Sequence, residues 1–179
     1  ELGQHGRFIC VLTDLQTGSP VYREITPDSP LWRIVLASIA IPPIVEPVEM
    51  GGRWFGDGGL SEALPIEWMI AQGYTDITVI LNRPLRSRDD PRFNRLVSPL
   101  ILRPFPLARR AFVEAAHRYN QGLHILKNPP SGVRIRVIAP QESLIGSLCR
   151  DREKLLRFWR HGYSEAYRAF GKTPPLPPF

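Results

Sequence analysis

Glycine and proline divide this sequence into short apolar segments, which limits the chain to short strands and helices joined by tight turns. Pro, Arg or Glu interrupts each of the longest apolar runs, and none approaches the roughly 18 to 20 residues that span a bilayer. With 43% hydrophobic and 22% charged residues, the composition is typical of a packed globular protein. The sequence therefore predicts a folded domain that does not cross a membrane.

The first part of the sequence predicts a hairpin, a helix and a second hairpin. Ser29 and Pro30 are typical of an N-cap and a first helical turn, and Pro42-Pro43 would end that helix after about eleven residues. Gly51 and Gly52 can adopt the positive φ angles of a tight hairpin turn. The expected elements are strands at 7–15 and 21–25, a helix from 30 onward, and extended segments at 44–49 and 53–55.

The second part predicts strands that alternate with helices, which favours an α/β fold. The segment 76–81 is apolar apart from one Thr, as a buried parallel strand between helices tends to be. We interpret residues 83–128 as a basic helical cap or insertion and residues 172–179 as a Pro-rich tail. The expected elements are helices at 66–72, 107–126 and 152–170, with Gly73 and Asp151 as caps, and strands at 76–81 and 133–139.

Positive charge is concentrated in one segment, between Arg83 and Arg118. This segment holds nine Arg and three acidic residues, so it accounts for the whole net charge of +6. Arginine mixed with apolar residues suits contact with anionic phospholipid headgroups, although a solvated charged face has the same composition. No nucleic-acid-binding motif accompanies the charge. The candidate lipid-contact residues are Arg83, Arg86, Arg88, Arg92, Arg95, Arg103, Arg109 and Arg110.

The candidate catalytic residue is Asp57, which lies between Gly56 and Gly58-Gly59 directly after a strand-like segment. Its carboxylate would project from a tight turn at a strand end, with no bulky side chain beside it. Asp and Gly are also common formers of ordinary turns, so the motif alone leaves a plain turn open.

Four sequence blocks follow one another around this turn, namely Leu36–Pro42, Val45–Val48, Gly51–Leu60 and Leu64–Ile66. Together they resemble the patatin-like phospholipases. The later segments Tyr119-Asn120, Pro129–Pro140 and Arg150–Tyr163 are similar to the bacterial branch of that family. In that family an Ala-Ser-x-Ala-x-Pro helix end precedes a hairpin, an Asp-Gly-Gly or Asp-Gly-Ala turn and an x-Pro-Val/Ile helix. The resemblance implies a three-layer αβα fold with a mostly parallel central sheet, of which residues 1–171 would be the C-terminal part.

The resemblance also implies a lipid acyl hydrolase, a phospholipase or esterase, that uses a Ser–Asp dyad and no metal or organic cofactor. Asp57, followed by Gly58 and Gly59, would be the dyad residue that orients and deprotonates the nucleophilic serine. A carboxylate with an ordinary pKa of about 3.9 is a weak base at neutral pH. We therefore expect Asp57 to be partly desolvated or to act mainly through its position.

The nucleophile of that family belongs to a Gly-x-Ser-x-Gly pentapeptide, which does not occur in these 179 residues, and the Gly-rich oxyanion loop is also absent. We therefore expect a C-terminal fragment that supplies the Asp and is inactive alone. Ser38 is expected to contribute to helix packing, and Ser19 and Ser29 to a turn and a cap. An alternative is a non-catalytic basic α/β module that binds membrane or other anionic partners, with Asp57 as a turn residue only.

The remaining expectations concern partners and location. Glu114, His117 and His124 have a spacing typical of one half of a di-metal site, but no second copy occurs, and we predict no metal. The expected partners are a lipid ester substrate and a peripheral membrane surface, not nucleic acid. Self-association through apolar surface exposed by truncation is a further expectation. We expect reduced cysteines and a location in the cytoplasm or at a membrane surface.

Overall fold

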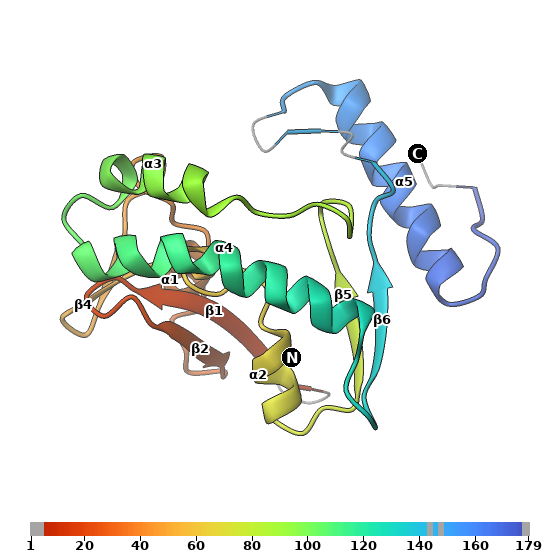
Figure 1. The fold of residues 1–179 in the computed structure, drawn as a ribbon, viewed down its shortest axis with the longest axis horizontal. Helices are drawn as coiled ribbons and strands as arrows, with labels where there is room; N and C mark the ends of the chain where they lie inside the picture. The colour runs from red at the N-terminus through yellow and green to blue at the C-terminus, as the bar shows by residue number, and fades with distance from the viewer. Residues whose placement is uncertain (1–5, 143–144, 147–148, 177–179) are drawn as a thin grey trace. The chain divides into compact units, whose positions relative to one another are not determined.

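The computed structural model describes residues 6–142, 145–146 and 149–176 and has a mixed α/β fold (Figure 1). The chain divides into two compact units. The first contains the residues up to Pro65 together with Arg88–Gly122, and the second contains Ile66–Ser87 together with the residues from Leu123 onward. The elements in chain order are β1 (Phe8–Asp14), β2 (Pro20–Ile25), α1 (Leu31–Ser38), β3 (Val48–Met50), β4 (Arg53–Asp57), the 3-10 turn η1 (Gly58–Leu60), α2 (Ile66–Ala71), β5 (Asp76–Ile80), α3 (Pro91–Ile101), α4 (Pro106–Lys127), β6 (Arg134–Ile138) and α5 (Arg152–Ala169).

The first unit is built on a four-stranded antiparallel sheet in the order β2–β1–β4–β3 (Figure 1). β1 and β2 form the first predicted hairpin, and β3 and β4 form the second. The turn of the second hairpin contains Gly51 and Gly52, with φ angles of 61° and 77°. β1 also pairs with β4, so that Leu12 lies opposite Asp57. Asp57 is therefore the last residue of a strand that is paired on both sides.

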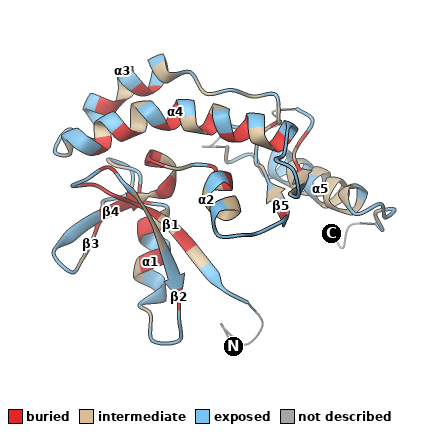
Figure 2. Cartoon of the chain, turned by 60° about the horizontal axis from the view of Figure 1, so that its bottom comes forward, coloured by how far each residue is buried: buried red, intermediate tan, exposed pale blue. Residues whose placement is uncertain are grey.

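Two apolar clusters stabilise the first unit. In one, Ile34 and Ala37 of α1 pack on side chains of the sheet that include Leu12 and Phe55. In the other, Leu102 and Ala108 at the start of α4 pack with Leu15 directly after β1 and Leu60 in η1. Figure 2 shows the buried residues along β1, β4 and one side of α1. Each buried large aliphatic side chain contributes about 1.5 to 3 kcal/mol to the stability of the fold. The first cluster includes Phe55 before η1 and the second includes Leu60 within it, so both ends of this turn are held by packing.

The second unit contains a parallel pair of strands, β5 and β6, in register from Asp76 opposite Arg134 to Ile80 opposite Ile138. α5 packs against β6, and Asp151 caps it by accepting the backbone N–H groups of Glu153 and Lys154, as predicted. None of the α5 side chains, all of which the structure describes, is buried. The second unit therefore depends less on buried apolar side chains than the first.

Most predicted elements are confirmed, and α1 and β3 differ at their ends. Ser29 was expected to cap α1, but its Oγ accepts the backbone N–H of Thr26 at 2.9 Å, and α1 has no side-chain cap. The helix is also shorter than expected, because it ends at Ser38. Residues 44–47 form a turn and an irregular segment, so the strand expected from residue 44 begins at Val48.

The larger corrections concern α3 and the sheets. The Pro- and Arg-rich segment before α4 contains a helix, α3, which begins at Pro91 with Asp90 as its N-cap and has Pro99 inside it. The larger sheet is antiparallel throughout, so the expectation of a mostly parallel central sheet is not met in this sheet. β5 is parallel as expected but is not a buried strand, because Ile77 is buried whereas Ile80 is 76% exposed.

Across the described residues, no helix has both the length and the apolar character that a membrane span requires.

Candidate functional site

Asp57 is held in place at the junction of β4 and η1. Its backbone N–H donates to the carbonyl oxygen of Ala40 at 2.8 Å, which fixes the strand end next to the segment that follows α1. Its carboxylate oxygen Oδ1 accepts the backbone N–H of Gly59 at 2.7 Å, so the side chain caps the 3-10 turn. The other carboxylate oxygen, Oδ2, accepts no hydrogen bond from any residue that the structure describes. One oxygen therefore orients the group and the other is free for a further partner.

The glycines beside Asp57 lie in little space, and the restriction is strongest at Gly58. A Cβ at Gly58 would lie 2.5 Å from the carbonyl oxygen of Val11, and a Cβ at Gly56 would lie 3.1 Å from that of Ala40. Neither glycine has a positive φ angle. Any side chain at Gly58 would push the turn away from β1, so this glycine allows the Asp57 turn to lie directly against the strand.

A buried hydroxyl network supports the turn from behind. The Oγ1 of Thr13 in β1 donates to the backbone carbonyl of Asp57 at 2.7 Å and lies 2.8 Å from the Oγ of Ser61. Thr13 and Ser61 are both fully buried. The Nε of Arg118 in α4 donates to the backbone carbonyl of Ser61 at 2.8 Å and so ties the turn to the helix.

The sequence interpretation did not select these three supporting residues. A Thr within the apolar strand β1 and a Ser four residues after Asp57 were the available signals, and both are common residues in such positions. Arg118 was counted only as part of the basic segment. In the structure it also donates to the carbonyl of Ala111 at 3.0 Å and pairs with Glu114 at 3.6 Å, so it has a structural role.

Burial raises the pKa of Asp57 above its ordinary value, although the hydrogen bond from Gly59 acts in the opposite direction. This agrees with the expectation of a partly desolvated carboxyl. A carboxylate with a raised pKa is a stronger base toward a hydroxyl group. Asp57 can therefore orient a hydroxyl at Oδ2 and accept its proton.

The serines of the described residues do not provide that hydroxyl. Ser61 is buried and bonded to Thr13. The Oγ of Ser38 donates to the carbonyl of Val35 at 2.8 Å, within α1, as the helix-packing interpretation expected. Among the residues that the structure describes, no serine Oγ is hydrogen-bonded to the carboxylate of Asp57.

The eight candidate lipid-contact arginines fall in both units. Arg83 and Arg86 belong to the second unit, and the other six belong to the first. Arg92 and Arg95 are exposed on α3, whereas Arg110 on α4 pairs with Glu114 at 3.0 Å. The remaining residues are Arg88, Arg103 and Arg109, of which the first two are exposed.

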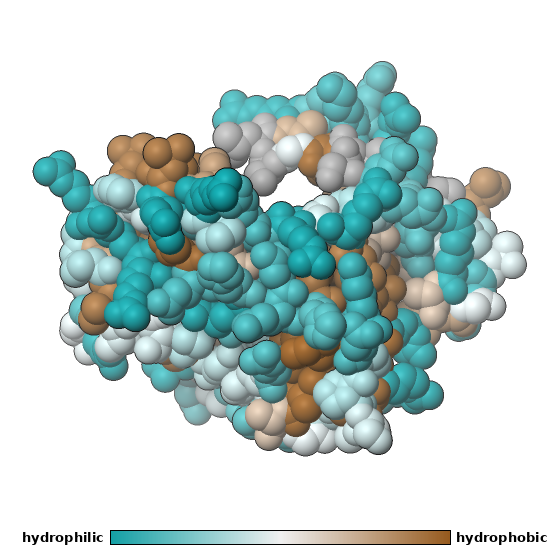
Figure 3. All heavy atoms as spheres, viewed as in Figure 1, coloured by the Kyte–Doolittle hydropathy of each residue, from teal (hydrophilic) through white to brown (hydrophobic). Residues whose placement is uncertain are grey.

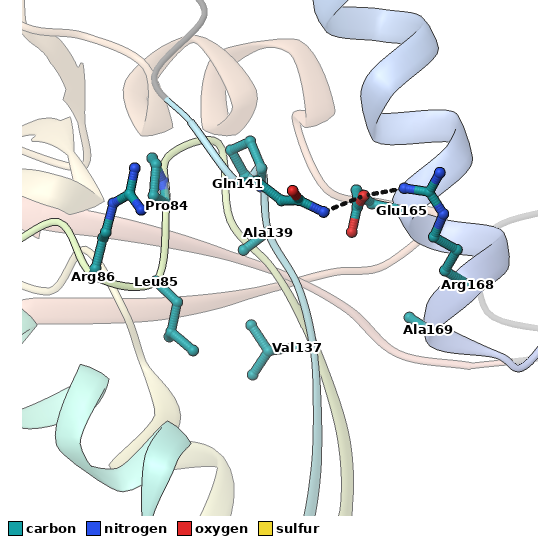
Figure 4. Close-up of a pocket in the computed structure, with 10 residues that line it drawn as sticks. Pro84, Leu85, Arg86, Val137, Ala139, Gln141, Glu165, Arg168 and Ala169 are labelled. Atoms are coloured by element: carbon teal, nitrogen blue, oxygen red, sulfur yellow. Dashed lines mark hydrogen bonds and ion pairs between the residues drawn. The ribbon is translucent and has the colours of Figure 1, made fainter.

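A hollow of about 670 Å³ lies in the second unit, lined by residues that include Arg86 and Val137 (Figure 4). Three of its polar groups bind one another. Figure 4 shows Glu165 between Gln141 and Arg168, and its Oε1 accepts hydrogen bonds from them at 3.3 Å and 2.6 Å. The described residues that line the hollow include no acid–nucleophile pair, and we assign it no chemistry.

Comparisons with known proteins identify related sequences for two stretches of the chain. Residues 9–70 match the family model of the patatin-like phospholipases. Residues 105–172 match a domain of unknown function, DUF6363. The first match includes most of β1 and all of β4 and η1, and therefore Asp57, and the second includes α4 and α5.

Curated relatives of the chain include uncharacterized NTE family proteins of Mycobacterium bovis and Mycobacterium tuberculosis. Each is 36% identical over 75 residues, which are 42% of this chain and 20% of the relative. The match therefore spans about a fifth of the length of these relatives. Together with the family match, this supports a relation to a lipid hydrolase family.

Proposed function

We propose that this chain is the Asp-bearing part of a patatin-like lipid acyl hydrolase, with Asp57 as the acid of a Ser–Asp dyad. The observation that carries the proposal is the geometry of the Asp57 carboxylate. It is fixed at a strand end by Gly59 through Oδ1, its pKa is raised by burial, and its Oδ2 is free. The family match over residues 9–70 includes this turn.

The nucleophilic serine and the oxyanion loop would come from residues outside this sequence, because no Gly-x-Ser-x-Gly pentapeptide occurs within it. The exposed side of α1 supports this part of the proposal. Five of its neighbouring large apolar residues are exposed, and Trp32 and Ile39 are 69% and 57% exposed. The set is Leu31, Trp32, Val35, Leu36 and Ile39. Ala40 lies two residues after the end of α1 and accepts the backbone N–H of Asp57. A segment packed on this side of α1 would therefore lie near the strand end that carries Asp57.

The proposed mechanism is acyl transfer through a covalent serine ester. Asp57 Oδ2 accepts the proton of the serine hydroxyl while the serine Oγ attacks the carbonyl carbon of the lipid ester. Collapse of the tetrahedral intermediate breaks the bond to the alcohol, which takes the proton from Asp57. Water, deprotonated by the same carboxylate, then attacks the acyl carbon. Collapse of this second intermediate breaks the bond to the serine Oγ, which takes the proton back from Asp57, and the fatty acid is released. Backbone N–H donors from the missing loop would stabilise the oxyanion, each by about 2.7 to 4 kcal/mol in other acyl-transfer enzymes.

The same proposal makes residues 1–171 the C-terminal part of one patatin-like domain, with residues 83–128 as its basic cap. It predicts that the 179-residue chain alone is inactive. The alternative, a binding module without catalysis, keeps Asp57 as a turn residue. The two proposals differ in whether an activated serine exists.

The test is labelling with a fluorophosphonate probe, which reacts with activated serines, followed by mass spectrometry of the labelled peptides. We expect the 179-residue chain to remain unlabelled and the product of the gene, expressed from its own start codon, to be labelled outside this sequence. Asp57→Asn in that product should greatly slow labelling. A label on a serine of this chain would contradict the proposal, and an unlabelled gene product would favour the binding module.

A further inference from the structure

The helix α3 exposes much of its apolar surface. Its buried side chains are polar, Asn94 and Ser98, and Ile101 at its end is partly buried. Three large apolar side chains are exposed, with Phe93 at 63% and Leu96 and Leu100 at 78% each. These three positions follow the spacing i, i+3 and i+7, so they form one stripe along the helix. We call this set, Phe93, Leu96 and Leu100, the α3 stripe.

The orientation of α3 is fixed by contacts on its inner side. The Nδ2 of Asn94 donates to the backbone carbonyl of Phe112 in α4 at 2.8 Å. At the end of the helix, Leu102 is fully buried in the cluster formed with Leu15 and Leu60. Turning the α3 stripe inward would break this hydrogen bond and expose Leu102. The stripe therefore faces solvent because of specific contacts, and Figure 3 shows hydrophobic atoms gathered on the surface at α3.

Positive charge accompanies the α3 stripe. Arg92 and Arg95 lie on the helix and Arg103 follows it, and all three are exposed. No acidic residue occurs between positions 91 and 103. Within the described part of the chain, no carboxylate forms an ion pair with any of these three arginines. The surface thus combines large apolar side chains with cations that have no partner in the first unit.

We propose that α3 is an interfacial helix that binds an anionic lipid bilayer. Phe93, Leu96 and Leu100 enter the boundary between headgroups and acyl chains, and Arg92, Arg95 and Arg103 bind lipid phosphates. Helices that lie in a bilayer interface have this combination of an apolar side and flanking arginines. Charge complementarity favours an anionic surface, since arginine side chains near it are attracted to the lipid phosphates. The proposal stands independently of the role of Asp57.

A second copy of the chain is a less suitable occupant. A specific protein–protein interface buries about 800 Å² on each partner and uses roughly 20 to 30 residues a side. The α3 stripe offers three large apolar side chains, and two copies would bring like-charged arginines together. A bilayer needs neither a complementary shape nor a large area, because the interface adapts to the helix.

The experiment is flotation of the 179-residue chain with vesicles of phosphatidylcholine alone or mixed with phosphatidylserine, at low salt. We expect binding to the mixed vesicles. L96Q/L100Q should weaken it by about tenfold or more, since both side chains are exposed and the change removes apolar area from the interface. R92Q/R95Q should weaken binding to mixed vesicles by about tenfold and leave binding to neutral vesicles unchanged.

Matched controls separate these effects from general changes in charge or hydropathy. W32Q/I44Q also replaces two exposed apolar residues of the first unit, 69% and 73% exposed. R23Q/R157Q, at two exposed arginines outside the candidate lipid-contact set, removes the same charge as R92Q/R95Q. Both controls, and Asp57→Asn, should bind mixed vesicles within about twofold of the original chain. Circular dichroism should show equal helix content for all variants.

The proposal would be overturned if L96Q/L100Q, with its helix content intact, bound the mixed vesicles as strongly as the original chain does. A second pair of results would also overturn it. In that case the original chain and all variants would fail to bind vesicles, and light scattering without lipid would show a dimer that L96Q/L100Q dissociates. That result would assign the α3 stripe to a second copy. Because the assay reads binding and not hydrolysis, a failure of the proposed catalytic role would leave its outcome unchanged.

Discussion

The two turns at the ends of β4 both contain a Gly-Gly pair, yet they need glycine for different reasons. At the start of the strand, Gly51 and Gly52 have positive φ angles, and a Cβ at either position would meet nothing within 4 Å. At its end, Gly58 has an ordinary φ angle, and its Cβ would collide with the backbone of Val11. The first turn uses the conformational freedom of glycine, and the second uses its small size.

This difference separates an ordinary hairpin turn from a candidate site. The first turn is open to solvent, so its sequence is restricted by backbone conformation alone. The second turn is pressed against β1, and its Asp is partly buried and bonded on one side only. Close packing is what gives the Asp57 carboxylate a fixed direction and a raised pKa. Substitutions at each turn test whether glycine is needed there for its conformation or for its small size.

The largest effect is expected for Gly58→Ala. Its Cβ would lie 2.5 Å from the Val11 carbonyl oxygen, which is backbone and cannot move freely. Overpacking of this kind costs typically 1 to 3 kcal/mol, and we expect about 3 kcal/mol of unfolding free energy to be lost. Urea unfolding measures it. A loss below about 1 kcal/mol would show that space does not explain this glycine.

A smaller loss, about 2 kcal/mol, is expected for Thr13→Val. The substitution keeps the shape of the side chain but removes the hydroxyl that bonds the Asp57 carbonyl and Ser61, leaving buried polar groups without this partner. Urea unfolding again gives the value. Thr17→Val, in the turn before β2, serves as an exposed control and should change stability by less than about 0.5 kcal/mol. Equal effects at both positions would argue against the hydroxyl network.

At the open turn, Gly52→Ala should cost about 1 kcal/mol, because a left-handed conformation is strained for Ala by about 1 to 2 kcal/mol and no collision adds to it. Gly52→Asn should cost less, since Asn tolerates this conformation. At Gly58, by contrast, Asn should be worse than Ala because it is larger. The same order of Ala and Asn at both sites would remove the distinction between the two turns.

The smallest effect is expected from the titration of Asp57. Its pKa is raised in the folded chain above the ordinary 3.8, so the folded state binds the proton more tightly than the unfolded state. The group therefore favours folding below its ordinary pKa, and this contribution is lost as the pH rises through the raised value. The stability of Asp57→Asn relative to the original chain should increase from pH 3 to pH 7. A flat difference between the two unfolding curves over this range would contradict the raised pKa.

Local sequence signals predicted the elements whose ends have a clear physical cause. The hairpin at Gly51-Gly52, the end of α2 before Gly73 and the start of α5 at Asp151 are in the structure as expected. Asp57 was selected from its glycine neighbours and from the resemblance of the surrounding blocks. The orientation of its carboxylate follows from the hydrogen bond that it accepts from the backbone N–H of Gly59, two residues further along the chain.

The parts that the sequence did not predict depend on contacts between distant segments. Ser29 is of a residue type that favours N-caps, but its hydroxyl oxygen accepts the backbone N–H of Thr26 instead. Thr13, Ser61 and Arg118 come together only when β1, η1 and α4 pack. The side of α3 that is buried depends on the hydrogen bond from Asn94 to α4 and on the packing of Leu102, so the outward direction of Phe93, Leu96 and Leu100 does not follow from the apolar pattern of the helix.

The most direct test of the central claim is kcat/KM for hydrolysis of a short-chain nitrophenyl ester by the gene product expressed from its own start codon. Asp57→Asn keeps the size of the side chain and an oxygen for the Gly59 N–H, and removes the base. Asp28→Asn, at an exposed turn, is the control. We expect a fall of about 10³-fold or more for Asp57→Asn, in line with the loss of the acid in other serine hydrolases, and no change for the control. Hydrolysis by Asp57→Asn at the rate of the control would contradict it.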